Sequence, residues 1–206
     1  MAIINCNEEA LSYLANIPVA YQEVEYIENS STGPYIDLGI KFTNLTKSHL
    51  KVMPKMTTWD VIYGMNEWSD TQDYRLFNYS NQFYFDLPGG SGSGNRIMGG
   101  SFAPNAVKEI EVGNFYVKNI WESSNIISGN TVGTFTASWT TRLNGTSKST
   151  NRRYWVKVRE NNTLVRDLYA CYRKSDNVVG MYDKVSKTFF TNSGSGSFTK
   201  GPNYKR

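Results

Sequence analysis

The segment from Trp68 to Asn78 gathers side chains of the kinds that bind sugars. A ring face packs against the C–H surface of a sugar, while Asp, Arg and Asn side chains hydrogen-bond to the sugar hydroxyls. We therefore predict that this segment forms a glycan-binding cluster. Its members are Trp68, Asp70, Asp73, Tyr74, Arg75 and Asn78. The alternative is that the rings are half-buried packing residues, which applies equally to Trp59, Trp121 and Trp139.

Three acids near the start of the chain are the best candidates for catalysis. Glu23, Glu25 and Glu28 superficially match the Glu-x-Asp-x-x-Glu signature of one family of sugar-cleaving enzymes, except that the middle acid is Glu25. In a strand Glu23 and Glu25 share a face, whereas Glu28 does so only if a bulge intervenes. A retaining hydrolase needs two carboxyl groups about 5–5.5 Å apart across a cleft, and nothing in this spacing provides them. We expect solvent-facing acids on an edge strand and no catalytic residue.

Metal-binding residues are sparse. His49 is the one histidine of the chain, so Ser–His–acid catalysis, Cys–His catalysis and His-based zinc sites lose support, and we expect a structural or surface histidine. Asp37, Asp70 and Asp73 are acids that a calcium ion at a loop rim would use, but their spacing matches no calcium-loop motif. We predict no metal site and no cofactor, with calcium as the alternative.

Charge and hydropathy argue against two classes of partner. Lys and Arg number 22 against 18 acids, which gives a net charge of +4, and these cations are scattered along the chain. A nucleic-acid surface needs a clustered basic face, so we expect no nucleic-acid partner. No stretch is apolar over the length of a membrane span, and the N-terminus lacks a basic region followed by an apolar core. We expect no membrane insertion, no signal peptide and synthesis in the cytoplasm.

The apolar residues suffice for the core of one all-β domain. They make up 39% of the 206 residues, and aromatic residues alone make up 14%. Large rings suit the space between two packed sheets, and we expect Trp155, on an alternating strand, in that core. Cys171 lies in an apolar run and is expected to be a small buried residue, with a disulfide to Cys6 as the alternative.

Short β-branched or aromatic runs separated by Gly, Asn, Ser and Asp are typical of antiparallel sheet proteins. The strands expected on this basis are Glu23–Glu28, Tyr35–Ile36, Ser48–Met53, Trp59–Met65, Tyr74–Tyr79, Gln82–Leu87, Ile97–Phe102, Val107–Val112, Asn114–Ile120, Ile126–Ile127, Phe135–Ser138, Tyr154–Glu160, Thr163–Tyr172, Val178–Asp183 and Thr188–Thr191. Asn161-Asn162 predicts the best-defined hairpin, because the strands on either side alternate apolar and polar residues.

A short helix is expected before the strands, over residues 7–16. Asn7 caps it, Glu8 and Glu9 suit its first turn, and Pro18 follows its end. Its apolar face must dock against something. We therefore divide the chain into an N-terminal helix and docking segment, residues 1–17, and a sandwich domain, residues 18–206.

Two segments carry a resemblance to a known family. Tyr21–Glu28 is followed by a turn and by Tyr35–Ile40, and Leu164–Asp183 is followed by Thr188–Pro202. These segments resemble the opening and closing motifs of concanavalin A-like (laminin-G-like) jelly-roll domains, which recur in bacteriophage virion proteins and in surface proteins of gut bacteria. The resemblance spans residues 18–203 and implies an all-β, two-sheet antiparallel jelly-roll sandwich.

The same resemblance implies a function. A non-enzymatic virion protein is expected, in a fibre, a head decoration or a tail appendage, with a lectin-like domain that adheres to host surface glycans. Its other partners would be virion proteins bound through the N-terminal helix and further copies of the same chain. The alternatives are a purely structural protein that cements capsid or tail subunits, and a glycoside hydrolase or lyase on the same fold. The fold alone does not choose, because sandwiches support many functions.

Overall fold

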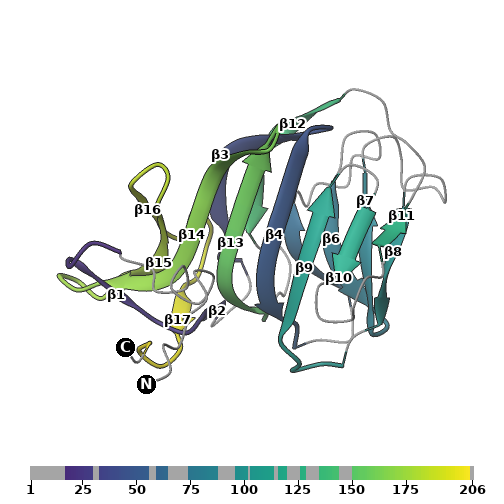
Figure 1. Ribbon diagram of the computed structural model, residues 1–206. Coiled ribbons are helices and arrows are strands. Elements are labelled where there is room, and N and C mark those ends of the chain that lie inside the picture. Colours follow the sequence, from purple (N-terminus) through teal and green to yellow (C-terminus); the bar gives the residue numbers. More distant parts are fainter. Residues whose placement is uncertain are drawn as a thin grey trace, which may run out of the picture.

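The computed structural model of the protein describes residues 17–29, 33–55, 59–64, 74–87, 96–101, 103–113, 116–119, 126–128, 135–143 and 150–204. Over these residues the chain is all-β, and its strands form two antiparallel sheets that pack as a β-sandwich (Figure 1). The predicted all-β, two-sheet fold is thereby confirmed. The jelly-roll topology stays a prediction, and the expected helix over residues 7–16 lies outside the described residues.

The larger sheet has eleven strands and the smaller sheet has six. The strands of the larger sheet are β1 (Tyr21–Glu23), β2 (Ile27–Asn29), β4 (Thr46–Met53), β9 (Lys108–Gly113), β10 (Tyr116–Asn119), β11 (Ile126–Ser128), β13 (Arg152–Glu160), β14 (Thr163–Arg173), β15 (Val179–Asp183), β16 (Thr188–Phe190) and β17 (Phe198–Lys200). The strands of the smaller sheet are β3 (Ile36–Thr43), β5 (Asp60–Gly64), β6 (Arg75–Tyr79), β7 (Gln82–Asp86), β8 (Arg96–Ser101) and β12 (Thr136–Leu143).

The strand order shows which segments become neighbours. The larger sheet runs β11-β10-β9-β4-β13-β14-β15-β16, with β1 beside β14 and β2 between β13 and β17. The smaller sheet runs β3-β12-β5-β6-β7-β8. In Figure 1 the strands β9, β4, β13 and β14 form one layer, and strands of the smaller sheet lie behind it. The two ends of the family-like region therefore meet in one sheet, through β1, β2, β14 and β17.

The expected strands differ from the observed ones in two places that matter. The run Glu23–Glu28 is interrupted between β1 and β2, because Val24 forms an isolated bridge with Asn203 near the end of the chain. Strand β3 extends well beyond Tyr35–Ile36 and contains Gly39, which has a φ of +65°. Residues with a side chain rarely adopt that φ, but glycine does so at little cost. Gly39 therefore lets β3 continue beyond the expected end of the strand.

The hairpin predicted at Asn161-Asn162 is confirmed. Glu160 and Thr163 are register partners across it, and the two asparagines have φ values of 46° and 64°. Positive φ at both central positions is the geometry of a type I′ turn, whose twist matches that of the flanking strands. Ser80 and Asn81 have φ values of 50° and 62° and form the equivalent turn between β6 and β7.

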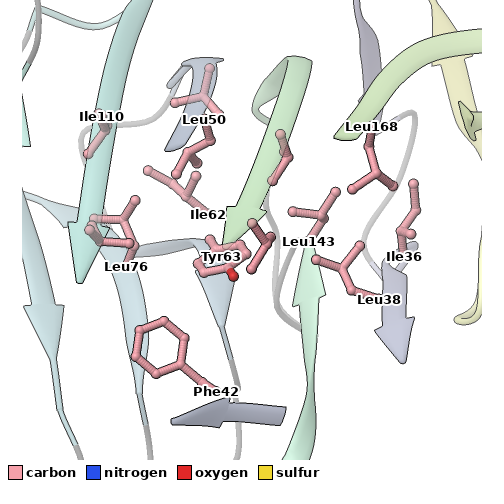
Figure 2. Packing of buried hydrophobic residues seen from close by; sticks show 14 of the residues in the cluster. Ile36, Leu38, Phe42, Leu50, Ile62, Tyr63, Leu76, Ile110, Leu143 and Leu168 are labelled. Carbon is pink, nitrogen blue, oxygen red and sulfur yellow. The ribbon is translucent and has the colours of Figure 1, made fainter. Parts of the chain in front are cut away.

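The core lies between the sheets and is built by strand alternation. Leu50 on the larger sheet lies beside Ile62 on the smaller sheet, and Leu168 lies beside Ile36, as Figure 2 shows. All four side chains are essentially inaccessible to solvent, and burying each stabilises the fold by about 1.5–3 kcal/mol. These contacts fix the two sheets relative to one another, so the outer faces are carried on a rigid body.

Arg153 on β13 is the largest fully buried side chain of the described residues. Alternation from the inward-facing Val156 predicts an outward Arg153, but the register of β13 against β4 slips after this residue and places it in the interior. Its Nη1 donates to Oδ1 of Asn29 and to the Asn151 carbonyl, both at 3.0 Å. Burial lowers the pKa of Arg153 to about 10, against the opposing effect of the nearby Asp60 carboxylate. The guanidinium therefore stays charged at neutral pH.

Candidate functional site

Three of the six predicted glycan contacts lie outside the described residues: Trp68, Asp70 and Asp73. The other three lie on or directly before β6, where successive side chains point to opposite sides of the sheet. Tyr74 and Asn78 share the side of Leu76, which faces the core, and both are fully buried. Only Arg75 projects to the outer face. Tyr74 and Asn78 therefore cannot contact a ligand at the surface, and of these three predicted contacts only Arg75 lies on the outer side of the sheet.

The interior position of Tyr74 has a clear structural role. Its ring stacks on Phe42 with a centroid distance of 4.3 Å, and its hydroxyl is hydrogen-bonded to Thr141. Burial raises the pKa of Tyr74, so the phenol stays neutral. Asn78 is the register partner of Asp60 on β5, at an equally buried position. Both residues help to hold the smaller sheet together.

The outer face of the smaller sheet carries a cluster of rings and arginines that includes Arg75. We call this cluster the ring patch; it consists of Trp59, Arg75, Phe77, Tyr79, Tyr84, Asp86 and Arg96. Phe77 lies at its centre, 4.1 Å from Trp59 and 5.2 Å from Tyr84 between ring centroids. The Arg75 guanidinium lies over the Trp59 ring at 4.9 Å, and that of Arg96 lies over the Tyr84 ring at 5.7 Å.

Asp86 holds the two arginines of the ring patch in place. Nε of Arg75 donates to Oδ2 of Asp86 at 3.1 Å, while Nε and Nη2 of Arg96 donate to its two oxygens at 2.6 and 3.0 Å. The hydrogen bond to Asp86 raises the pKa of Arg96. Asp86 is only 4% exposed, so water screens its attraction to the two guanidinium groups only weakly. The patch is consequently preorganised, with rings and donors fixed before any ligand arrives.

Exposure increases from the centre of the ring patch to its rim. Phe77 is 1% exposed and Tyr79 is 49% exposed, while Trp59 and Tyr84 are half-buried. A half-buried ring exposes part of its surface to solvent, while its packing against Phe77 holds it in place. Such rings, beside the Arg96 guanidinium with its 32% exposed side chain, can pack against the C–H surface of a sugar and hydrogen-bond its hydroxyls. Arg75 is nearly inaccessible and instead supports the Trp59 ring from below.

The sequence named two members of this patch, Trp59 and Arg75, and missed the rest. A signal for the rest was present in the turn between the expected strands Tyr74–Tyr79 and Gln82–Leu87. A two-residue turn at Ser80-Asn81 fixes the register and makes Phe77 face Tyr84 and Arg75 face Asp86. Arg96 comes from the next hairpin strand, where it is the partner of Asp86.

The outer face of the larger sheet holds two neighbouring hollows. One, the ring pocket, is lined by Glu23, Val24, Glu25, Lys51, Tyr154, Trp155, Tyr169 and Tyr204. The other, the cation pocket, is lined by Lys47, His49, Glu111, Lys157 and Arg159. His49 and Trp155 stand between them, in edge contact at 4.6 Å between ring centroids. His49 Nε2 also lies 3.6 Å from the Glu109 carboxylate. The His49 side chain is partly exposed on this outer face.

Trp155 is buried, at 6% exposure, but not in the core between the sheets. Its neighbour Val156 faces that core, so Trp155 faces outward with its register partner Tyr169 and with Tyr182 on the next strand. Trp155 is thus buried in a hydrophobic cluster, as expected, but this cluster lies on the outer face of the larger sheet, because Trp155 alternates with the inward-facing Val156. Cys171 lies in the same outer cluster as a free and fully buried thiol, as expected.

The three acids considered for catalysis have three different environments. Glu23 is 8% exposed and Glu25 is exposed, and both line the ring pocket. Glu28 accepts hydrogen bonds from Lys55 and, at 2.8 Å, from Arg152. Burial by itself raises the pKa of Glu28, but these two cations lower it overall. The expectation of solvent-facing acids thus holds for Glu25 but not for Glu23.

No group of three or more His, Cys, Asp or Glu side chains that could hold a metal ion occurs among the described residues. Asp37, one of the acids considered for calcium, accepts hydrogen bonds from Thr140 at 2.6 Å and from the Gly39 amide at 2.8 Å. In the same part of the chain, no helix has the length and apolar character needed to cross a membrane.

Comparison with known proteins assigns no family: no family model matches the chain, and no curated protein matches it either. The resemblance to concanavalin A-like jelly-roll domains therefore stays a prediction from the sequence.

Proposed function

We propose that this protein is a non-enzymatic, glycan-binding module of a bacteriophage virion, and that the ring patch is its sugar-contacting surface. The observation that carries the binding role is the geometry of the patch. Trp59 and Tyr84 expose ring surface on either side of Phe77, and Asp86 fixes two arginines beside them. A rigid surface with rings and donors binds a sugar without the cost of ordering mobile side chains.

A binding role fits the charges of the ring patch better than catalysis does. Glycoside hydrolysis uses one carboxyl group as an acid and a second as a nucleophile or base. Asp86 is bonded to both Arg75 and Arg96, so both of its oxygens already accept hydrogen bonds from guanidinium groups. A carboxylate held in this way is not free to approach a sugar carbon or the oxygen of a leaving group. In this patch the role of Asp86 is to position the arginines.

The virion assignment depends on the family resemblance and remains open to a separate test. Partners in a virion would be other structural proteins and further copies of the chain, with the N-terminal segment as the predicted attachment. Genes for capsid, portal and tail proteins beside the gene of this protein would support the assignment. A neighbourhood devoted to secretion or polysaccharide use would contradict it.

Binding by the ring patch can be tested with a glycan array and three variants. We expect the wild-type protein to bind at least one neutral glycan and Trp59→Ala and Tyr79→Ala to lose most of that signal. Tyr79 is half exposed, so its removal leaves the fold intact, and thermal unfolding of each variant checks this. Trp68→Ala tests the loop position that the sequence suggested.

Two results would contradict the proposal. One is binding that survives both the Trp59 and the Tyr79 substitution, which would remove the ring patch as the site. The other is measurable cleavage of a polysaccharide that is abolished by changing a single carboxylate, which would make the protein an enzyme.

A further inference from the structure

Cations stand directly opposite one another on the outer face of the larger sheet. In the register of β4 against β13, Lys47 faces Arg159 and His49 faces Lys157. Like charges directly opposite in a sheet destabilise it, and Lys47 with Arg159 is such a pair at every physiological pH. This register gives the fold no ion pair between the two strands at these positions, which suggests that the charges serve a ligand.

Several cations elsewhere in the described residues are matched by carboxylates, whereas others, such as Arg142 and Lys200, lie over aromatic rings. The matched sets are Lys55 and Arg152 with Glu28, Arg75 and Arg96 with Asp86, and Arg173 with Asp176. In the cation pocket, by contrast, Arg159 forms no side-chain hydrogen bond or ion pair with any residue that the structure describes, Lys157 lies over the Trp155 ring at 5.7 Å, and Lys47 donates only to the neutral amide of Asn162, at 3.2 Å. Glu111 is the one carboxylate lining this pocket, against three cations.

The pocket chemistry matches an oxyanion. The hollow has a volume of about 100 Å³ and opens to solvent, which is room for a carboxylate or a phosphate. An arginine binds such a group through two parallel N–H donors, and a nearby lysine adds a point charge. Lys157 and Arg159 lie two residues apart on one face of β13, so they can approach the same group from neighbouring positions.

The ring pocket next to it suggests what carries the oxyanion. Trp155 and Lys157 are also two residues apart on this face, about 7 Å along the strand. The Lys157 ammonium lies 5.7 Å from the centroid of the Trp155 ring, so it can meet an exocyclic charged group of a sugar that lies in the adjoining ring pocket. Tyr154 and Tyr204 line the ring pocket with more accessible rings than Trp155, and the carboxylate of Glu25 can accept hydrogen bonds from sugar hydroxyls.

From this arrangement we infer that the outer face of the larger sheet binds an acidic saccharide. The carboxylate or phosphate group lies between Lys47, Lys157 and Arg159, and the sugar ring lies in the ring pocket. This is a second site, on the opposite side of the sandwich from the ring patch and with different chemistry. It therefore goes beyond the function proposed above and does not depend on it.

Titration of the full-length protein, followed by NMR chemical shifts, tests the site with four probes: glucuronic acid, glucose 6-phosphate, glucose and inorganic phosphate. We expect at least one of the two acidic sugars to bind about tenfold or more tightly than glucose and than inorganic phosphate. Lys157→Gln and Arg159→Gln should each weaken that binding by about tenfold, and the double variant should abolish it. Thermal unfolding should change little, because removing one of two opposed cations does not harm the sheet.

Lys174→Gln is the matched control, because Lys174 is an exposed cation on the same sheet but follows β14 at its far end. It should bind the acidic sugars like the wild type. Equal affinity for glucose and the acidic sugars, or full binding by the double variant, overturns the inference. Inorganic phosphate binding as tightly as the sugars overturns the role of the ring pocket. Trp59→Ala should leave this binding unchanged, so failure here is distinguishable from failure of the ring patch.

Discussion

On the outer face of the six-stranded sheet, Asp86 bonds to both Arg75 and Arg96, whereas on the outer face of the eleven-stranded sheet Lys47 stands directly opposite Arg159. Both faces have a buried ring at the centre, Phe77 on one and Trp155 on the other, with a cationic side chain lying over it. Rings and cations are therefore common to the two faces, and the partners of the cations distinguish them.

The difference separates what charges do for the fold from what they can do for a ligand. A charge that is bonded to a buried carboxylate stabilises the folded state, and its removal leaves the partner exposed to an unfavourable environment. A charge opposed to a like charge weakens the fold and becomes favourable only when an anion joins it. Substitutions on the two faces should consequently move stability in opposite directions.

The largest effect is expected from Asp86→Asn in the ring patch. Loss of this carboxylate removes the one negative charge that pairs with two guanidinium groups, of which Arg75 is only 5% exposed. We expect the free energy of unfolding to fall by about 3–5 kcal/mol, measured by urea denaturation. Asp176→Asn is the control, because Asp176 and Arg173 form an exposed pair that should contribute little. Equal stability of Asp86→Asn and the wild type would show that the patch charges do not support the fold.

A smaller effect is expected from acid, through Glu28 and its two cations. Hydrogen bonds from Lys55 and Arg152 keep the pKa of Glu28 below its usual value, although burial alone would raise it. The stability that Glu28 contributes is therefore complete above its unfolded pKa of about 4.3 and is lost as the pH falls through the lower, folded value. Glu28→Gln should lower the free energy of unfolding by about 1–3 kcal/mol at pH 7. In urea denaturation at several pH values, this difference should shrink below about pH 4; a difference that stays constant would contradict the assignment.

Reversing one charge in the cation pocket should make the protein slightly more stable. Lys47→Glu turns the opposed pair with Arg159 into an attractive pair, so the free energy of unfolding should rise by about 0.2–1 kcal/mol. Urea denaturation at low ionic strength measures this, and added salt should reduce the gain. The same variant should bind acidic sugars more weakly. A clear loss of stability instead would mean that Lys47 already has a structural role.

The smallest expected effect is an absence of reaction at Cys171. Burial raises the pKa of this thiol to about 12, so almost no thiolate forms near neutral pH, and only the thiolate is a good nucleophile. In a Cys6→Ser background, an aromatic disulfide reagent at pH 8 should leave the native protein unmodified and should label Cys171 fully in urea. Rapid labelling of the native protein would show that the ring cluster around Trp155 opens readily, unlike the ring patch.

Much of the fold could be predicted from local sequence, and the reasons are particular. Alternation and the Asn161-Asn162 pair specify the β13–β14 hairpin, because a type I′ turn requires two residues that tolerate positive φ. The same rule applied to Ser80-Asn81 gives the contacts of Phe77 with Tyr84. The break between β1 and β2 could not be predicted, since it depends on a bridge from Val24 to Asn203, far away in sequence.

The glycan cluster shows why chemistry is harder to read than strands. The sequence grouped Tyr74, Arg75 and Asn78 because they are close along the chain, but a pleated strand sends neighbours to opposite sides. Tyr74 and Asn78 therefore lie inside, and Arg75 joins Asp86 and Arg96 on the outside. The opposed cations of the other face, Lys47 and Arg159, are more than a hundred residues apart in the chain, so no local pattern could bring them together.

By itself, the sequence determined that this protein is built of short antiparallel strands rich in rings, because side-chain alternation and turn residues are local properties. The tertiary structure decided which side chains share a face. A one-residue slip in β13 moved Arg153 into the interior, and strand register placed Lys47 opposite Arg159. Register is set by the packing of whole sheets against a common core, and a slip of one residue exchanges every inward side chain for an outward one.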